Sequence, residues 1–182
     1  VAKKGLQIWH GQDPLIKPNE AVVFDDEQER FYQAVYDVKR DKVVRLADET
    51  VRDIEVSENS QALIATSDVP YLRERTWAGF FEDVYLVNLK DGKRSLVAKR
   101  LDSSFAVEAS PSGRYVAYYN DGNFWLFDAR KKRHTKLSGG LPVGFANEDH
   151  DYPKAAEGYG IAGWLDNDRG FLAYDKFDIW LF

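Results

Sequence analysis

Residues 110–128 read SPSGRYVAYYNDGNFWLFD, two runs of aromatic and aliphatic residues on either side of an Asn-Asp-Gly turn. Aromatic and β-branched side chains favour strands, and Asn-Asp-Gly is typical of a tight hairpin because it tolerates positive φ. A basic turn at residues 129–132 then leads to a third short run at 134–137. This stretch therefore predicts three antiparallel strands joined by short turns.

The same pattern of short apolar runs and polar turns precedes and follows this stretch. Before it we expect strands at 61–66, 83–89 and 95–97, and after it at 163–168, 170–174 and 178–182. A repeat of roughly 40–55 residues with four strands is typical of β-propeller blades. We therefore predict an all-β chain, a β-propeller fragment of roughly three to four four-stranded blades. The predicted blades cover residues 5–48, 51–100, 103–138 and an incomplete 160–182.

The ends of the predicted blades are less regular. Residues 5–9 and 53–57 predict strands that open the first and second blades, and residues 31–38 and 43–46 the last two strands of the first. Residues 19–30 predict a helical turn. Residues 178–182 predict a third strand without a fourth, so we expect a partial ring that tends to self-associate.

Composition excludes several classes of function. The chain has 182 residues and a net charge of −5, and its one basic run, at 130–134, lies in a predicted turn where solvent would surround it. A nucleic-acid partner would require a basic face, so none is expected. No apolar run approaches the roughly 20 residues that cross a bilayer. The chain has no cysteine, which excludes disulfides and thiolate metal sites, and no cofactor is expected.

Several longer motifs point to one family. Residues 144–153 read GFANEDHDYP, residues 159–164 YGIAGW and residues 174–180 YDKFDIW, and residues 66–71 and 77–89 fit the same group. Together they resemble the propeller domain of bacterial prolyl-oligopeptidase-family (dipeptidyl-peptidase-like) serine peptidases. The resemblance implies peptide substrates, an extracytoplasmic (periplasmic or secreted) location, and an α/β-hydrolase domain with a Ser-His-Asp triad in the same parent protein. No Gly-x-Ser-x-Gly occurs in this chain, so no catalytic residue is assigned here.

Two loops carry candidate substrate-binding residues. Glu148, Asp149, His150 and Asp151 form an acidic stretch that would attract a substrate amine. The alternative is that the carboxylates cap turns and His150 satisfies backbone groups between blades. A metal site is not expected there, because adjacent residues of one loop do not aim enough ligands at one point.

The long connection at 68–82 holds the second group, Arg73, Arg75 and Trp77. These side chains would bind a peptide carboxylate or a partner domain, since Arg and Trp are favoured at interaction sites. The alternative is that the aromatic residues fill space under the loop while the arginines pair with Glu74 and Glu82.

Three functions remain open at this point. The first is a non-catalytic propeller portion that gates and helps bind peptides for the hydrolase domain. The second is a stand-alone propeller interaction module. The third is a propeller enzyme, which would require paired carboxylates on inner strands, and only Asp53, Glu55 and Glu108 offer them.

Overall fold

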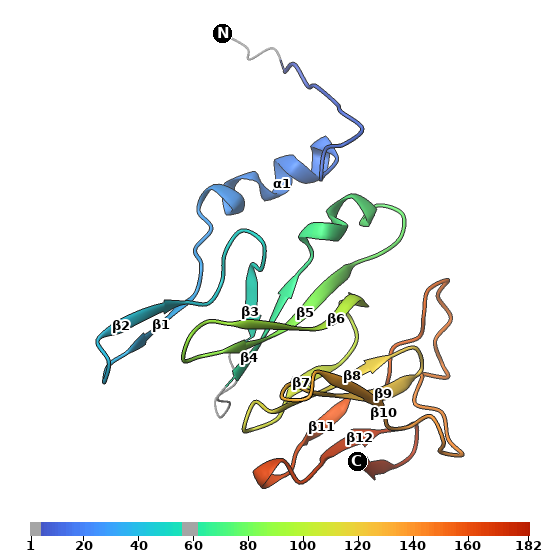
Figure 1. Cartoon of the computed structure of the whole chain (residues 1–182). Helices are drawn as coiled ribbons and strands as arrows, with labels where there is room; N and C mark the ends of the chain where they lie inside the picture. The colour runs from blue at the N-terminus through green and yellow to red at the C-terminus, as the bar shows by residue number, and fades with distance from the viewer. Residues whose placement is uncertain (1–4, 56–61) are drawn as a thin grey trace.

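The computed structural model describes residues 5–55 and 62–182, which form mostly β structure in four antiparallel sheets (Figure 1). Two sheets have four strands each, in chain order. The first contains β3 (Asp53–Glu55), β4 (Ala62–Ser67), β5 (Phe81–Asn88) and β6 (Arg94–Asp102). The second contains β7 (Val107–Ala109), β8 (Tyr115–Asn120), β9 (Asn123–Asp128) and β10 (Arg133–Lys136).

The other two sheets are smaller. One has three strands, β11 (Ile161–Trp164), β12 (Phe171–Tyr174) and β13 (Ile179–Leu181), and the other is the hairpin of β1 (Ala34–Asp37) and β2 (Lys42–Arg45). The helix α1 (Lys17–Gln28) precedes β1, and two 3-10 helices, η1 (Val69–Glu74) and η2 (Asp166–Asp168), lie between strands. No helix among the described residues is long and apolar enough to span a membrane.

The hairpin expected from the sequence is confirmed. Strand β8 pairs with β9 from Tyr115–Asp128 to Asn120–Asn123, so only two residues, Asp121 and Gly122, make the turn. Both have positive φ, 49° and 72°, which matches the right-handed twist of the paired strands.

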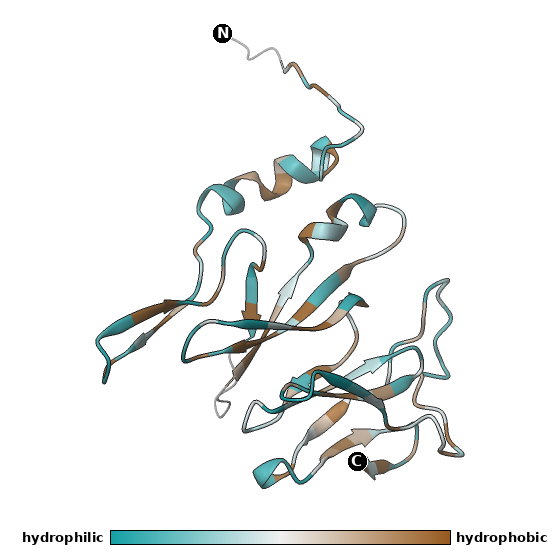
Figure 2. Ribbon diagram, in the orientation of Figure 1, coloured by the Kyte–Doolittle hydropathy of each residue, from teal (hydrophilic) through white to brown (hydrophobic). Residues whose placement is uncertain are grey.

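The N-terminal prediction is wrong in one respect and confirmed in another. Residues 5–9 form no strand, and Leu6 and Ile8 are 85% and 72% exposed, because no neighbouring strand pairs with them. The first predicted blade therefore has only two strands, β1 and β2. The helical turn expected at 19–30 forms as α1, two residues nearer the N-terminus. This helix mixes apolar and polar residues along its length and buries none (Figure 2). Part of the predicted strand at 53–57 lies outside the described residues.

The sheet β3–β6 is covered on both faces. Side chains of β4 alternate between them: Leu63 and Ala65 belong to a core shared with β1–β2, while Ala62 and Ile64 belong to a core shared with β7–β10. This alternation follows from the two-residue period of a strand. Four successive residues of β4 are buried for this reason, and the sheets stack one after another.

The larger core centres on Phe124, which is fully buried on β9. Its ring lies 5.6 Å from Tyr119, 5.4 Å from Phe145 and 6.1 Å from Phe171, measured between centroids. These partners come from β8, the 139–160 connection and β12. One side chain thus joins the second four-stranded sheet to the three-stranded sheet.

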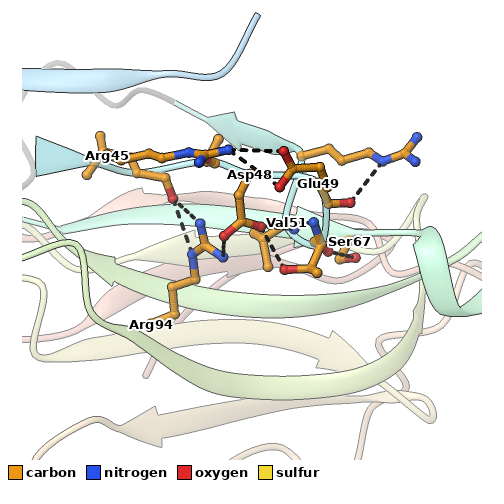
Figure 3. Close-up of polar contacts among 10 residues, drawn as sticks. Arg45, Asp48, Glu49, Val51, Ser67 and Arg94 are labelled. Atoms are coloured by element: carbon orange, nitrogen blue, oxygen red, sulfur yellow. Dashed lines mark hydrogen bonds and ion pairs between the residues drawn. The ribbon is translucent and has the colours of Figure 1, made fainter. Parts of the chain in front are cut away.

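A polar cluster fastens the connection after β2 to sheet β3–β6 (Figure 3). Arg94 on β6 donates to the Leu46 carbonyl oxygen at 2.6 Å and to Asp48 Oδ2 at 2.8 Å. Asp48 Oδ1 in turn accepts hydrogen bonds from the Thr50 hydroxyl at 2.7 Å and the Val51 N–H at 3.0 Å. The cluster joins β1–β2 to the rest of the molecule.

The turn before β8 approaches β4 so closely that it requires glycine. Gly113 has φ 68°, and a Cβ there would lie 2.5 Å from Ala62 Cβ and 3.1 Å from Ala62 N. We expect Gly113→Ala to lower the free energy of unfolding by about 2–3 kcal/mol, through backbone strain and the clash between sheets. Urea denaturation followed by tryptophan fluorescence measures the loss.

Gly122→Ala is the matched control for that substitution. Gly122 has φ 72°, but a Cβ at this position would meet no atom within 4 Å, so the variant retains only the backbone strain, about 1 kcal/mol. Equal losses in the two variants would refute the close approach of the sheets at Gly113.

Candidate functional site

Two glutamates from neighbouring sheets line one cavity. Glu55 lies on β3 and Glu108 on β7, the first strands of the two four-stranded sheets. The cavity has a volume of about 310 Å³, and its remaining wall is apolar, formed by Ala62, Ile64, Val107 and Ala109. The two carboxylates therefore face a small space between the sheets.

The two carboxylates give this cavity an acidic lining and repel each other. Burial raises the pKa of Glu108, and repulsion from Glu55 raises it further. Among residues 5–55 and 62–182, neither carboxylate takes part in an ion pair. Asp53, the third inner-strand candidate, does not line this cavity. Its carboxylate lies 3.7 Å from the Arg30 guanidinium and lines a different cavity under α1.

The structure brings Arg73 and Trp77 together but turns Arg75 elsewhere. Arg73 and Trp77 line a cavity between η1 and the N-terminal segment, and Trp77 is 71% exposed. Arg75 instead pairs with Asp68 at 3.0 Å and lies over the Phe80 ring.

The arginines of this loop do not form the expected ion pairs with Glu74 and Glu82. Glu74 pairs with Arg100 of β6 at 2.6 Å, so it is not available to Arg73 or Arg75. The 3-10 turn of η1 lets Arg75 fold back onto Asp68, the residue just before the turn.

The acidic loop carries its own counter-ion. Lys176 Nζ lies 3.0 Å from Asp149 and 3.5 Å from Glu148, and hydrogen bonding with Asp149 raises the lysine pKa. His150 Nε2 donates a hydrogen bond to the Lys154 carbonyl oxygen at 3.1 Å, so the imidazole is hydrogen-bonded within its own loop. Glu148, Asp149, His150 and Asp151 therefore present a loop whose negative charge is partly neutralised.

The two candidate loops belong to different parts of the molecule. The connection after β10 that carries the acidic loop lies beside the second and third sheets, whereas η1 lies in the connection between β4 and β5, at the end of sheet β3–β6 (Figure 1). No hydrogen bond or ion pair between described residues joins the loop to η1. The residues proposed from sequence thus do not form one site, and their role in substrate binding stays a prediction.

Glu82 on β5 is a perturbed carboxyl that the sequence does not reveal. Burial raises its pKa to about 7, against a hydrogen bond with Thr66, and nearby Asp68 and Asp53 contribute in the same direction as burial. Glu82 occupies an ordinary position in the alternating pattern of a strand, so nothing in the sequence indicates that its pKa is raised. In the described part of the chain, no group of three or more His, Cys, Asp or Glu side chains is arranged to hold a metal ion.

Comparison with known proteins adds no family assignment. No protein-family model matches the sequence, and no curated protein matches it either.

Proposed function

We propose that this chain is part of a β-propeller that binds peptides for a serine-peptidase hydrolase domain of the same parent protein, outside the cytoplasm. Supporting this are two four-stranded meanders in chain order, a third sheet of three strands, and the motifs at 144–153 and 159–164. In this proposal the chain itself is non-catalytic and contributes gating and binding.

The observation that carries the peptide-binding role is the cavity of Glu55 and Glu108. In a propeller the first strand of each blade faces the central channel, so β3 and β7 would both border the channel. Two carboxylates on an apolar wall favour a peptide amine, because an ammonium forms charge-assisted hydrogen bonds with both. A folded protein would not fit such a space, whereas an extended peptide end would.

Peptide titrations test this role. We expect a tripeptide with a free N-terminus to bind the chain, and its N-acetylated form to bind at least tenfold more weakly. Glu108→Gln should weaken binding of the free amine by about tenfold, since one of the two charged acceptors is lost. Isothermal titration calorimetry at pH 7.5 measures both effects.

Glu29→Gln is the control, because Glu29 is an exposed glutamate at the end of α1, away from the cavity. Equal affinity for the two peptides, or no effect of Glu108→Gln, would contradict an amine site.

The peptidase part of the proposal has a separate test. A serine-reactive phosphonate should label the parent protein but leave this chain unlabelled, since no Gly-x-Ser-x-Gly is present in it. Peptide binding without any labelling of the parent would instead favour a stand-alone interaction module.

A further inference from the structure

A second cavity lies between the N-terminal segment and η1. Its volume is about 310 Å³. Residues 9–11, 13–16 and 19 form one wall, and Leu72, Arg73, Thr76 and Trp77 form the other. Arg73 Nη2 donates to the Gly11 carbonyl oxygen at 2.5 Å and so holds the two walls together. Segments about 60 residues apart in the sequence therefore enclose one space.

Two exposed indoles flank this space. Trp9 is 59% exposed and Trp77 is 71% exposed, whereas the other three tryptophans, Trp125, Trp164 and Trp180, pack against the larger core. Exposed aromatic side chains that gather at one place are typical of ligand or partner sites. Both line the same cavity, which favours a flat apolar ligand group.

The unpaired charge of the cavity is positive. Asp13, its acidic residue, accepts a hydrogen bond from the His10 N–H at 3.1 Å and lies 3.3 Å from Lys17 Nζ, so its charge is compensated. Arg73 takes part in no ion pair among the described residues, and its only hydrogen bond to them goes to the Gly11 carbonyl oxygen. Its other N–H groups remain able to bind a carboxylate in a forked geometry.

We propose that this cavity binds a carboxylate attached to a flat apolar group, with Arg73 holding the carboxylate and Trp9 and Trp77 stacking on the apolar part. The C-terminal aromatic residue of a peptide and a free arylalkyl carboxylate share this chemistry. The site is separate from the Glu55–Glu108 cavity, and the inference does not rest on the proposed function.

The test compares ligands on the unmodified chain. N-acetylphenylalanine should bind saturably, and its carboxamide, which lacks the charge, should bind at least tenfold more weakly. Equal binding of acid and amide, or no saturable binding of the acid up to about 10 mM, would overturn the proposal. A peptide that ends in phenylalanine and 3-phenylpropionate distinguish the sources. A peptide bound more tightly than 3-phenylpropionate identifies a peptide terminus, equal binding identifies a free arylalkyl carboxylate, and both outcomes support the shared chemistry.

Substitutions then assign the residues. Arg73→Gln should weaken binding of the acid about tenfold and leave the amide unchanged. Arg169→Gln is the matched control, because Arg169 is also exposed and donates to one backbone carbonyl, that of Asp166. The assignment would be refuted if Arg73→Gln bound the acid as tightly as the wild type does. It would also be refuted if Arg169→Gln lost acid binding to the same extent as Arg73→Gln. Should Arg73→Gln also loosen the N-terminal segment, Trp77→Ala provides a second variant, expected to weaken acid and amide alike.

Discussion

Phe124→Ala is expected to lower the free energy of unfolding by about 4 kcal/mol, the largest effect of any single substitution proposed for this chain. Phe124 is completely buried, and its ring contacts the rings of Tyr119, Phe145 and Phe171 from three separate segments. Removing it leaves a cavity that these rings cannot close, because each is fixed by its own strand or connection. Thermal melting should show a decrease of about 10 °C in Tm.

Phe31→Ala is the control for size and chemistry, since Phe31 is 90% exposed. Its loss should change the free energy of unfolding by less than about 0.5 kcal/mol. A small effect of Phe124→Ala, similar to that of Phe31→Ala, would mean that the second and third sheets do not share a core.

The sequence predicts individual strands well where local signals are strong. The run before Asn120-Asp121-Gly122 and the run after it form β8 and β9, because alternation and turn chemistry act over a few residues. Residues 5–9 have equally apolar composition yet form no strand. A strand requires a partner edge, and no local pattern indicates whether one is available.

For the candidate sites too, the sequence indicates single residues but not which distant residues lie beside them. The sequence marks Glu55 and Glu108 as possible inner-strand carboxylates, but their common cavity depends on how two sheets pack. Nothing in the sequence marks Trp9 as a ligand-binding candidate, since its role depends on the N-terminal segment lying against η1 some 60 residues later. The expected partners of Arg75 and Glu74 are wrong because charge alone does not select between Asp68, Arg100 and closer neighbours.

Asp48 connects a local turn to a distant strand, which makes it the second position with a large expected effect. Burial opposes ionisation of Asp48, but hydrogen bonds from Thr50, Val51 and Arg94 outweigh it and lower the pKa. A carboxyl with a lowered pKa in the folded state stabilises the protein above about pH 4, the unfolded value. That contribution is lost as the pH falls through the folded-state pKa.

Control and coupling experiments separate the turn from the ion pair. Glu49→Ala removes an exposed carboxylate that lies 3.4 Å from Arg45, and should cost less than about 0.5 kcal/mol. Arg94→Ala removes both the ion pair with Asp48 and the two hydrogen bonds to the Leu46 carbonyl oxygen. A double-mutant cycle with Asp48→Ala should therefore give a coupling of about 1–2 kcal/mol.

Asp48→Ala itself should lower the free energy of unfolding by about 3 kcal/mol at pH 7, because the Thr50 and Val51 N–H groups lose their acceptor and Arg94 loses its partner. The difference between the variant and the wild type should shrink as the pH is lowered from 5 to about 2, since the unfolded wild-type chain then binds a proton that the folded Asp48 carboxylate still excludes. Urea denaturation across this pH range measures both quantities. A difference that stays constant with pH would mean that Asp48 acts through its hydrogen bonds and not through its charge. No difference at any pH would mean that packing of Leu46 and Val51 alone holds the connection after β2.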